Sequence, residues 1–151
     1  MNVATQEAPC RNNSVNLIAF DKSSTAPYAG IPFTSFFDPR ACGRAPQMIN
    51  NFLSSEVETG AGDDLMQYID NVQAGDSVVI YSIGDAGVAS WSANVKTKLG
   101  LLGINPTDLG NLQVGEPFVI FSKKGAPVGT AKIFRATQAP AAQQELFGGS
   151  R

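Results

Sequence analysis

The order of apolar and polar segments predicts an α+β domain in which helices pack on one side of a mostly antiparallel or mixed β-sheet. Three observations lead to this prediction. Short strand-like runs separated by turn residues fill the first third of the chain, and a nearly continuous apolar run covers residues 77–83 (SVVIYSI). An apolar stripe at helical spacing then precedes two further strand-like runs. The 151 residues are enough for one domain with its own core.

The first half of the chain contains three predicted extended segments. Residues 15–20 (VNLIAF) have apolar side chains on both sides of a strand, and a turn-rich connection follows at residues 21–30. Residues 31–37 (IPFTSFF) predict a second strand, placed near an edge because Pro32 cannot donate a ladder hydrogen bond. An irregular loop covers residues 38–46, and residues 48–52 extend again.

The middle of the chain predicts helix, strand and helix. Asp63 and Asp64 suit the start of a short helix, because carboxylates are favourable at its N-terminal end. The nearly continuous apolar run at residues 77–83 is typical of a central strand. Apolar residues then recur at spacings of 3, 4, 4 and 3, which predicts one amphipathic helix that ends at Gly103. These apolar residues are Val88, Trp91, Val95, Leu99 and Leu102.

Three elements complete the predicted domain. A short helix begins with Asn105 as its cap and Pro106 at its first position. A buried strand follows at residues 116–121 (EPFVIF). After a turn at residues 123–125 (KKG), a last strand at residues 130–134 (TAKIF) closes the sheet.

Composition excludes several classes of function. The chain has no histidine, so it lacks a Ser-His-Asp triad, a Cys-His dyad and an HExxH zinc helix. Its 11 basic and 13 acidic residues give a net charge of −2, without a basic cluster that could follow a phosphate backbone. No window approaches the ~18 apolar residues of a membrane span. We therefore expect a non-enzymatic protein without cofactor or metal, which binds no nucleic acid and has no membrane span.

The two cysteines are relevant to the cellular compartment of the protein. Cys10 and Cys42 are too far apart for a CxxC redox motif, and a disulfide between them is expected if the protein is exported. Two free thiols in a reducing cytosol are the alternative. Residues 1–14 form an N-terminal extension without the features of a signal peptide. Residues 136–151 resemble a linker ending in a cloning remnant (GGSR), which suggests a module from a longer chain.

Three residues stand out as candidates for binding, each with a structural alternative. Asp85 lies in the loop GDAG (residues 84–87) between the central strand and the following helix, where exposed backbone N–H groups often form sites. A turn or capping role is the alternative. Trp91 is the only tryptophan and fits either a ligand platform or the core. Lys124 lies at a turn, where a lysine is most often solvated.

The order of several segments resembles a known family. These segments are VNLIAFDKSSTAPYAG, FTSFFD, LMQYIDNVQAGDSVVIYSIGDAG, KLGLLG and EPFVIFSKKGAP, and together they cover residues 15–135. They resemble the interleukin-like EMT inducer domain, or GG domain. The chain is most similar to versions in exported bacterial proteins, including sortase-like proteins of type IX secretion. The resemblance implies a secreted or cell-surface domain with two packed β-sheets, helices on one side and no catalytic residues.

The resemblance also implies a binding function. In a glycosyltransferase stem the domain binds a sugar, and Asp85 occupies the position of the acidic residue that contacts it. Lys124 matches the basic residue before Gly125, and Glu116 lies where the family usually has Asp, although Gly115 replaces the preceding Arg. We therefore expect an accessory domain that recognises carbohydrate or a glycosylated surface, with Trp91 as a further candidate contact.

The alternative function is a structural interaction module that packs against neighbouring protein domains of its parent chain. Exposed aromatic residues would then serve as interface anchors. The candidates for this role are Phe33, Phe36 and Phe37.

Overall fold

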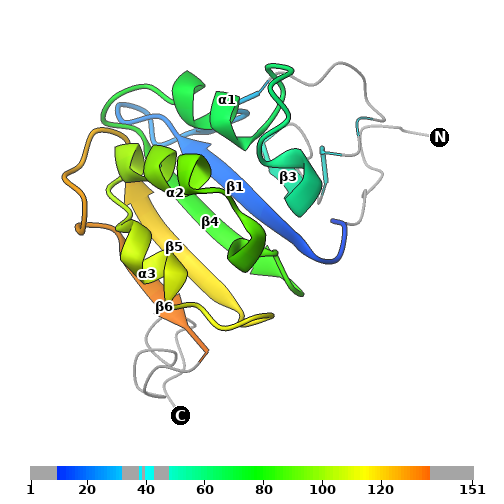
Figure 1. Cartoon of the computed structure of the whole chain (residues 1–151). Coiled ribbons are helices and arrows are strands. Elements are labelled where there is room, and N and C mark those ends of the chain that lie inside the picture. Colours follow the sequence, from blue (N-terminus) through cyan, green and yellow to red (C-terminus); the bar gives the residue numbers. More distant parts are fainter. Residues whose placement is uncertain (1–9, 32–37, 39, 43–47, 137–151) are drawn as a thin grey trace, which may run out of the picture.

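A computed structural model describes residues 10–31, 38, 40–42 and 48–136. In this part of the chain six strands form an antiparallel sheet, and short helices lie on one of its faces (Figure 1). The strand order is β2-β1-β4-β5-β6, and β3 also pairs with β1. The predicted α+β class is thus confirmed. Where we expected two packed sheets, the described residues form a single one.

Strand β1 (Ser14–Phe20) lies inside the sheet and has three partners. Along one side it pairs with β4 over its whole length. On its other side, its first four residues pair with β3 (Asn50–Leu53) and its last two pair with β2 (Pro27–Tyr28). The predicted first strand is confirmed, whereas the short β2 lies inside the predicted connection. Residues 32–37 of the predicted second strand, which include Phe33, Phe36 and Phe37, lie outside the described residues.

Strands β4 (Ser77–Ile83), β5 (Phe118–Lys123) and β6 (Lys132–Arg135) complete the sheet. The register places one residue from each of four strands in a row across it. Three of these side chains are fully buried and the fourth, on β6, packs against the core. The row consists of Leu17, Ile80, Ile120 and Ile133. Because side chains alternate along a strand, this row fixes which face of each strand points toward the helices.

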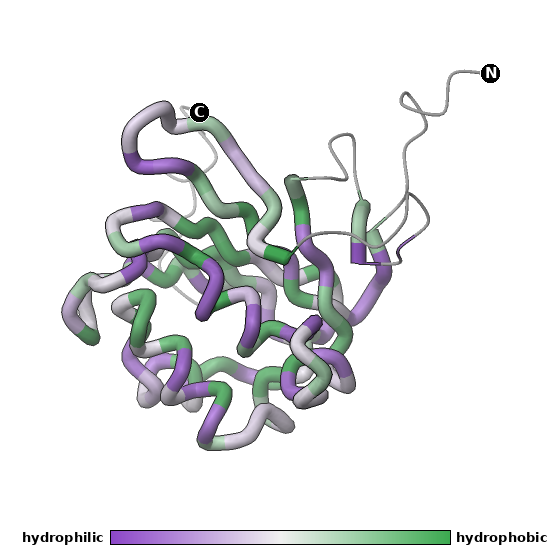
Figure 2. The backbone as a smooth tube through the Cα atoms, turned by 90° about the horizontal axis from the view of Figure 1, so that it is seen from above, coloured by the Kyte–Doolittle hydropathy of each residue, from purple (hydrophilic) through white to green (hydrophobic). Residues whose placement is uncertain are grey.

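The helices α1 (Leu65–Asn71), α2 (Ala93–Leu99) and α3 (Pro106–Gly110) cover this face. In Figure 2 the helical turns alternate between hydrophobic and hydrophilic residues, as expected for a layer with one side toward a core. The predicted caps are confirmed: Asp64 accepts a hydrogen bond from the Gln67 N–H, and Asn105 accepts one from the Thr107 N–H. A 3-10 turn, η2 (Ser54–Glu56), follows β3.

The predicted long helix after β4 is interrupted. A 3-10 turn, η3 (Val88–Ser90), precedes α2, and a second, η4 (Gly100–Leu102), follows it. Between η3 and α2 the backbone of Trp91 and Ser92 is extended, and the Ser92 hydroxyl accepts a hydrogen bond from the Val95 N–H. Ser92 thus starts a new helix, because a serine side chain caps an N-terminus better than it continues a helix. Helix α2 itself ends at Leu99, and η4, which continues it, is capped by Gly103, the predicted stop.

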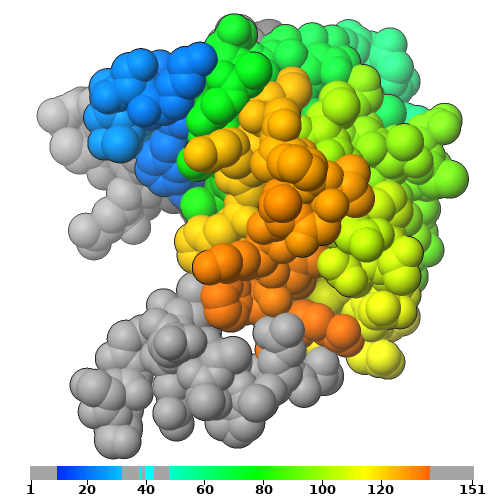
Figure 3. Space-filling model, turned by 90° about the vertical axis from the view of Figure 1, so that its left-hand side faces the viewer, coloured from blue at the N-terminus to red at the C-terminus, as the bar shows by residue number. Residues whose placement is uncertain are grey.

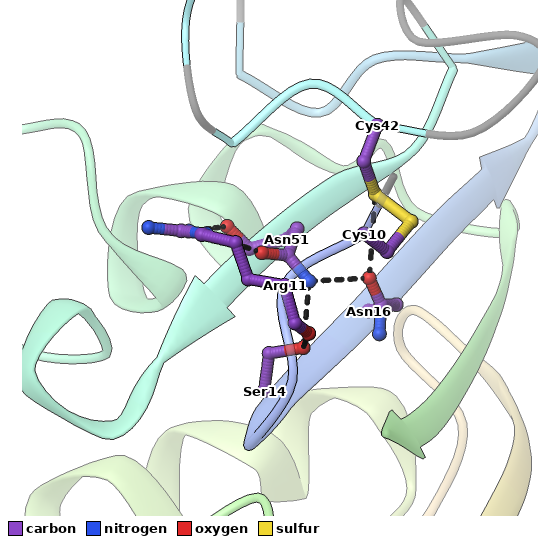
Figure 4. Close-up of a disulfide and its surroundings, with 6 residues drawn as sticks. All are labelled: Cys10, Arg11, Ser14, Asn16, Cys42 and Asn51. Atoms are coloured by element: carbon purple, nitrogen blue, oxygen red, sulfur yellow. Dashed lines mark hydrogen bonds between the residues drawn. A yellow bond between two sulfur atoms is a disulfide. The ribbon is translucent and has the colours of Figure 1, made fainter. Parts of the chain in front are cut away.

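A disulfide joins Cys10 to Cys42, which confirms the predicted bridge (Figure 4). Beside it, the buried Asn51 side chain donates to the hydroxyl of Ser14 and to the side-chain oxygen of Asn16, at 2.7 Å each. The Arg11 guanidinium binds both Asn51 and the carboxylate of Glu56. The bridge and this network fasten the segment before β1 to β3 and the loop that carries Cys42.

Loss of the disulfide should lower the free energy of unfolding. The double variant Cys10→Ser/Cys42→Ala frees a loop with a sequence separation of 32 residues. Closing such a loop stabilises a protein by about 3–4 kcal/mol in the chain-entropy model. Urea unfolding of the oxidised protein and of the double variant measures the difference. Equal unfolding midpoints and equal slopes for the two proteins would show that the disulfide does not stabilise the fold.

A buried carboxylate fixes the other end of β1. Asp76 accepts hydrogen bonds from the Lys22 N–H and from the Tyr28 hydroxyl. Burial and the Asp76 carboxylate raise the pKa of Tyr28 to about 12, from the ordinary value of 10. The phenol of the folded protein therefore stays protonated at a pH where that of the unfolded chain ionises. Its contribution to stability is complete below about pH 10 and is lost as the pH rises through about 12.

The variant Tyr28→Phe should lower the free energy of unfolding by about 1–3 kcal/mol near pH 8, because Asp76 loses a donor. The gap between wild type and variant should narrow near pH 11, where only the unfolded wild type has lost the Tyr28 proton. Urea unfolding at both pH values measures this gap. A gap of constant size would contradict the assigned hydrogen bond.

Candidate functional site

Lys124 stabilises the end of a helix. Its ammonium group donates hydrogen bonds to the carbonyl oxygens of Ile69 and Val72, the latter at 3.0 Å. These carbonyls lie at the C-terminal end of α1, where no backbone N–H is left to bind them. Burial lowers the pKa of Lys124. Lys124 therefore joins the end of β5 to α1, whereas its position at a turn had predicted a solvated side chain.

Glu116 also has a structural role, because its carboxylate binds other parts of this chain. Its side chain is 2% exposed and pairs with the guanidinium of Arg135 on β6 at 3.0 Å. It also accepts a hydrogen bond from the Gln113 N–H at 2.8 Å, and Arg135 donates to the carbonyl of Asn111. The carboxylate thus fastens the loop before β5 to the edge strand.

Asp85 and Trp91 lie on either side of the 3-10 turn η3. Trp91 is 6% exposed and belongs to the hydrophobic core, which favours the structural alternative for this residue. Asp85 is exposed; its backbone N–H donates to the side-chain oxygen of Asn13, and its carboxylate accepts a hydrogen bond from the Gly87 N–H at 2.9 Å. Of the four candidate contacts, Asp85 is the one whose side chain lies at the surface.

The structure does not bring these residues together. Lys124 follows Lys123, and Lys123 pairs with the first residue of β4. Asp85 lies two residues beyond the last residue of β4. A seven-residue strand spans about 20 Å, so the two side chains lie at opposite ends of the sheet. One small ligand could not contact both.

A different group of side chains forms a continuous surface. On the sheet face opposite the helices, eight apolar residues of β1, β4, β5 and β6 are half-buried or exposed, and none belongs to the core cluster. Within the described residues no helix covers them, and in Figure 3 the helical layer lies on the right of β6 (orange) only. We call this surface the open face. It consists of Ile18, Phe20, Val79, Tyr81, Ile83, Val119, Phe121 and Phe134.

Four of the eight residues are aromatic. Phe121 is 41% exposed, and its ring contacts that of Phe134 edge to face, with centroids 5.8 Å apart. Tyr81 lies beside Val119, and partial burial raises the pKa of its hydroxyl. Aromatic side chains with one side in contact with the protein and the other exposed are typical of binding surfaces.

At one end the open face deepens into a hollow. This hollow has a volume of about 280 Å³ and lies between the starts of β4 and β6 and the end of β5. Its lining combines apolar, hydroxyl and basic side chains, among them Val79, Phe121, Ser77, Thr130, Lys123 and Lys132. The open face therefore offers both apolar contact area and charged groups.

Sequence reasoning missed the open face. The runs at residues 77–83 and 116–121 predict a central strand and a second buried strand, but within the described ranges helices cover one face of the sheet only. The alternation of Phe121 with Ser122 and Lys123 was the available signal, since an exposed lysine two residues after an aromatic residue places both on the same face.

A comparison of the chain with protein-family models, curated proteins and solved structures found no match. None of the helices in the described ranges is long and apolar enough to cross a bilayer. In the same part of the chain, no three acidic or cysteine side chains are arranged to hold a metal ion.

The two neighbouring lysines should differ in their effect on stability. Lys124→Met should lower the free energy of unfolding by about 1–3 kcal/mol, because two helix-end carbonyls lose their donor. The matched control Lys123→Met changes an exposed side chain and should stay within about 0.5 kcal/mol of wild type. Urea unfolding measures both. A similar loss in the two variants would rule out the capping role.

Proposed function

We propose that this chain is a non-catalytic docking module of an exported protein, which holds a neighbouring protein domain against its open face. The observation that carries the proposal is the apolar surface formed by β1, β4, β5 and β6, which no helix of the described residues covers. A continuous apolar surface of this kind on a folded protein is typical of an interaction site.

The composition of the open face supports a protein partner. Interfaces between proteins are enriched in aromatic residues, which occupy half of the eight positions here. Covering apolar surface stabilises a complex by roughly 25 cal/mol per Å² before the entropic cost of association is subtracted. A partner that covers Phe20, Tyr81 and Phe121 together would gain this stabilisation from three aromatic side chains.

The carbohydrate alternative has less support. Of its four candidate contacts, Trp91 lies in the core, and Glu116 and Lys124 bind other parts of this chain. Only Asp85 presents its carboxylate at the surface. One carboxylate contributes about 1.5–3 kcal/mol through its hydrogen bonds, which is too little for specific binding of a sugar without further groups.

Export is supported by the disulfide between Cys10 and Cys42, since such bridges persist in oxidising compartments. The absence of histidine from the chain supports a role in binding over one in catalysis. The resemblance to domains of sortase-like proteins suggests that the partner is another domain of the same exported assembly.

Site-specific cross-linking in the producing cells tests the proposal. A photoreactive benzoylphenylalanine in place of Phe121 should form cross-links to protein, because this side chain lies on the open face. The same group in place of Thr97, an exposed residue of α2 in the helical layer, is the matched control. The site at 121 should give cross-linked peptides at least about tenfold more often than the site at 97.

Equal yields from the two sites would contradict docking at the open face. A glycan-array screen tests the alternative function, which is carbohydrate recognition. Binding of a glycan by wild type that is lost in Asp85→Ala would favour carbohydrate recognition through the loop after β4.

A further inference from the structure

Two lysines lie side by side at the hollow end of the open face. Lys132 pairs with Phe121 across β5 and β6, and Lys123 lies two residues after Phe121 on the same face. The two lysines are therefore diagonal neighbours on adjacent strands, with Cβ atoms roughly 7–8 Å apart. Both line the hollow.

These lysines have no partner in the described part of the chain. There, Arg11, Arg40, Lys98 and Arg135 form ion pairs, and Lys22 and Lys124 donate to backbone carbonyls. Lys123 and Lys132 form neither kind of contact. Two like charges at diagonal positions repel each other, and a carboxylate between them would remove this repulsion.

The charge of the open face is opposite to that of the chain. The chain has a net charge of −2, yet no carboxylate occupies an open-face position on the six described strands. The charged groups at these positions are Lys123 and Lys132. A partner with apolar side chains and one suitably placed carboxylate would complement this surface in both respects.

We infer that the partner presents a protein segment in which an acidic side chain is flanked by apolar residues, and that its carboxylate binds in the hollow between Lys123 and Lys132. The flanking apolar residues pack on Phe121, Phe134 and Val79. This inference rests on the proposed docking function and specifies the chemistry of the partner.

Fluorescence polarisation with two probe peptides tests the inference on the full chain. One is a fluorescein-labelled pentapeptide with four leucine and phenylalanine residues around a single aspartate, and the other has asparagine in place of the aspartate. The aspartate peptide should bind about 3- to 10-fold more tightly at low ionic strength. This difference in affinity should shrink near 0.5 M salt, where the Debye length is about 4 Å.

Two variants test which residues produce the preference for the aspartate peptide. Lys123→Gln/Lys132→Gln should abolish the preference for the aspartate peptide and leave binding of the asparagine peptide unchanged, because the apolar contacts stay intact. Phe121→Ser should weaken both peptides alike. Thermal unfolding confirms that each variant is folded.

The remaining outcomes separate this inference from the proposed function. Equal affinities of the two peptides for wild type, both lost in Phe121→Ser, would overturn the preference for an acidic segment and leave docking in place. Failure of both peptides to bind would overturn the inference, whereas docking itself is decided by the cross-linking yields. Tighter binding of polygalacturonate, lost in the double lysine variant, would replace the protein segment with an acidic polysaccharide.

Discussion

The structure depends on one constraint, namely that helices cover only one face of an antiparallel sheet. The buried row Leu17, Ile80 and Ile120 sets the phase of side-chain alternation in three adjacent strands. A shift by one residue in any of these strands would exchange its core side chains with those of the other face. The same register therefore determines the core and the open face, and neither can change without the other.

The polar residues at the ends of elements follow from this two-layer arrangement. Helices that end above a sheet leave carbonyls and N–H groups that must find partners, and nearby side chains supply them. Lys124 binds the last carbonyls of α1, Asp64 caps its start, and Ser92 caps α2. Glu116 serves the loop before β5 in the same way. Residues that stand out in a sequence because they are polar and flank apolar runs are often of this kind.

The strands and helices could largely be predicted from the sequence, but which face of each strand the helices cover could not. Strand β4, the cap residue Asn105 and Pro106 at the first helical position follow from local chemistry alone. The interruption at Ser92 was missed because Trp91 and Val95 keep a helical spacing on either side of it. The site was missed for another reason: Lys123 and Lys132 are nine positions apart, and only the register of β5 with β6 makes them neighbours. A continuous apolar run shows that a strand is apolar on both sides, but not which side the rest of the chain covers.

The separation of core and open face has a consequence for binding. The residues that hold the helices and those that we propose to contact a partner project from the same strands in opposite directions, so the sheet itself is a rigid support. Docking on Phe121 or Tyr81 needs no rearrangement of α1, α2 or α3, because none of these helices contacts that face. Little ordering entropy then opposes association, and apolar area of moderate size is sufficient for it. The disulfide and the Arg11 network restrain the start of β1, which keeps this support in place when a partner is absent.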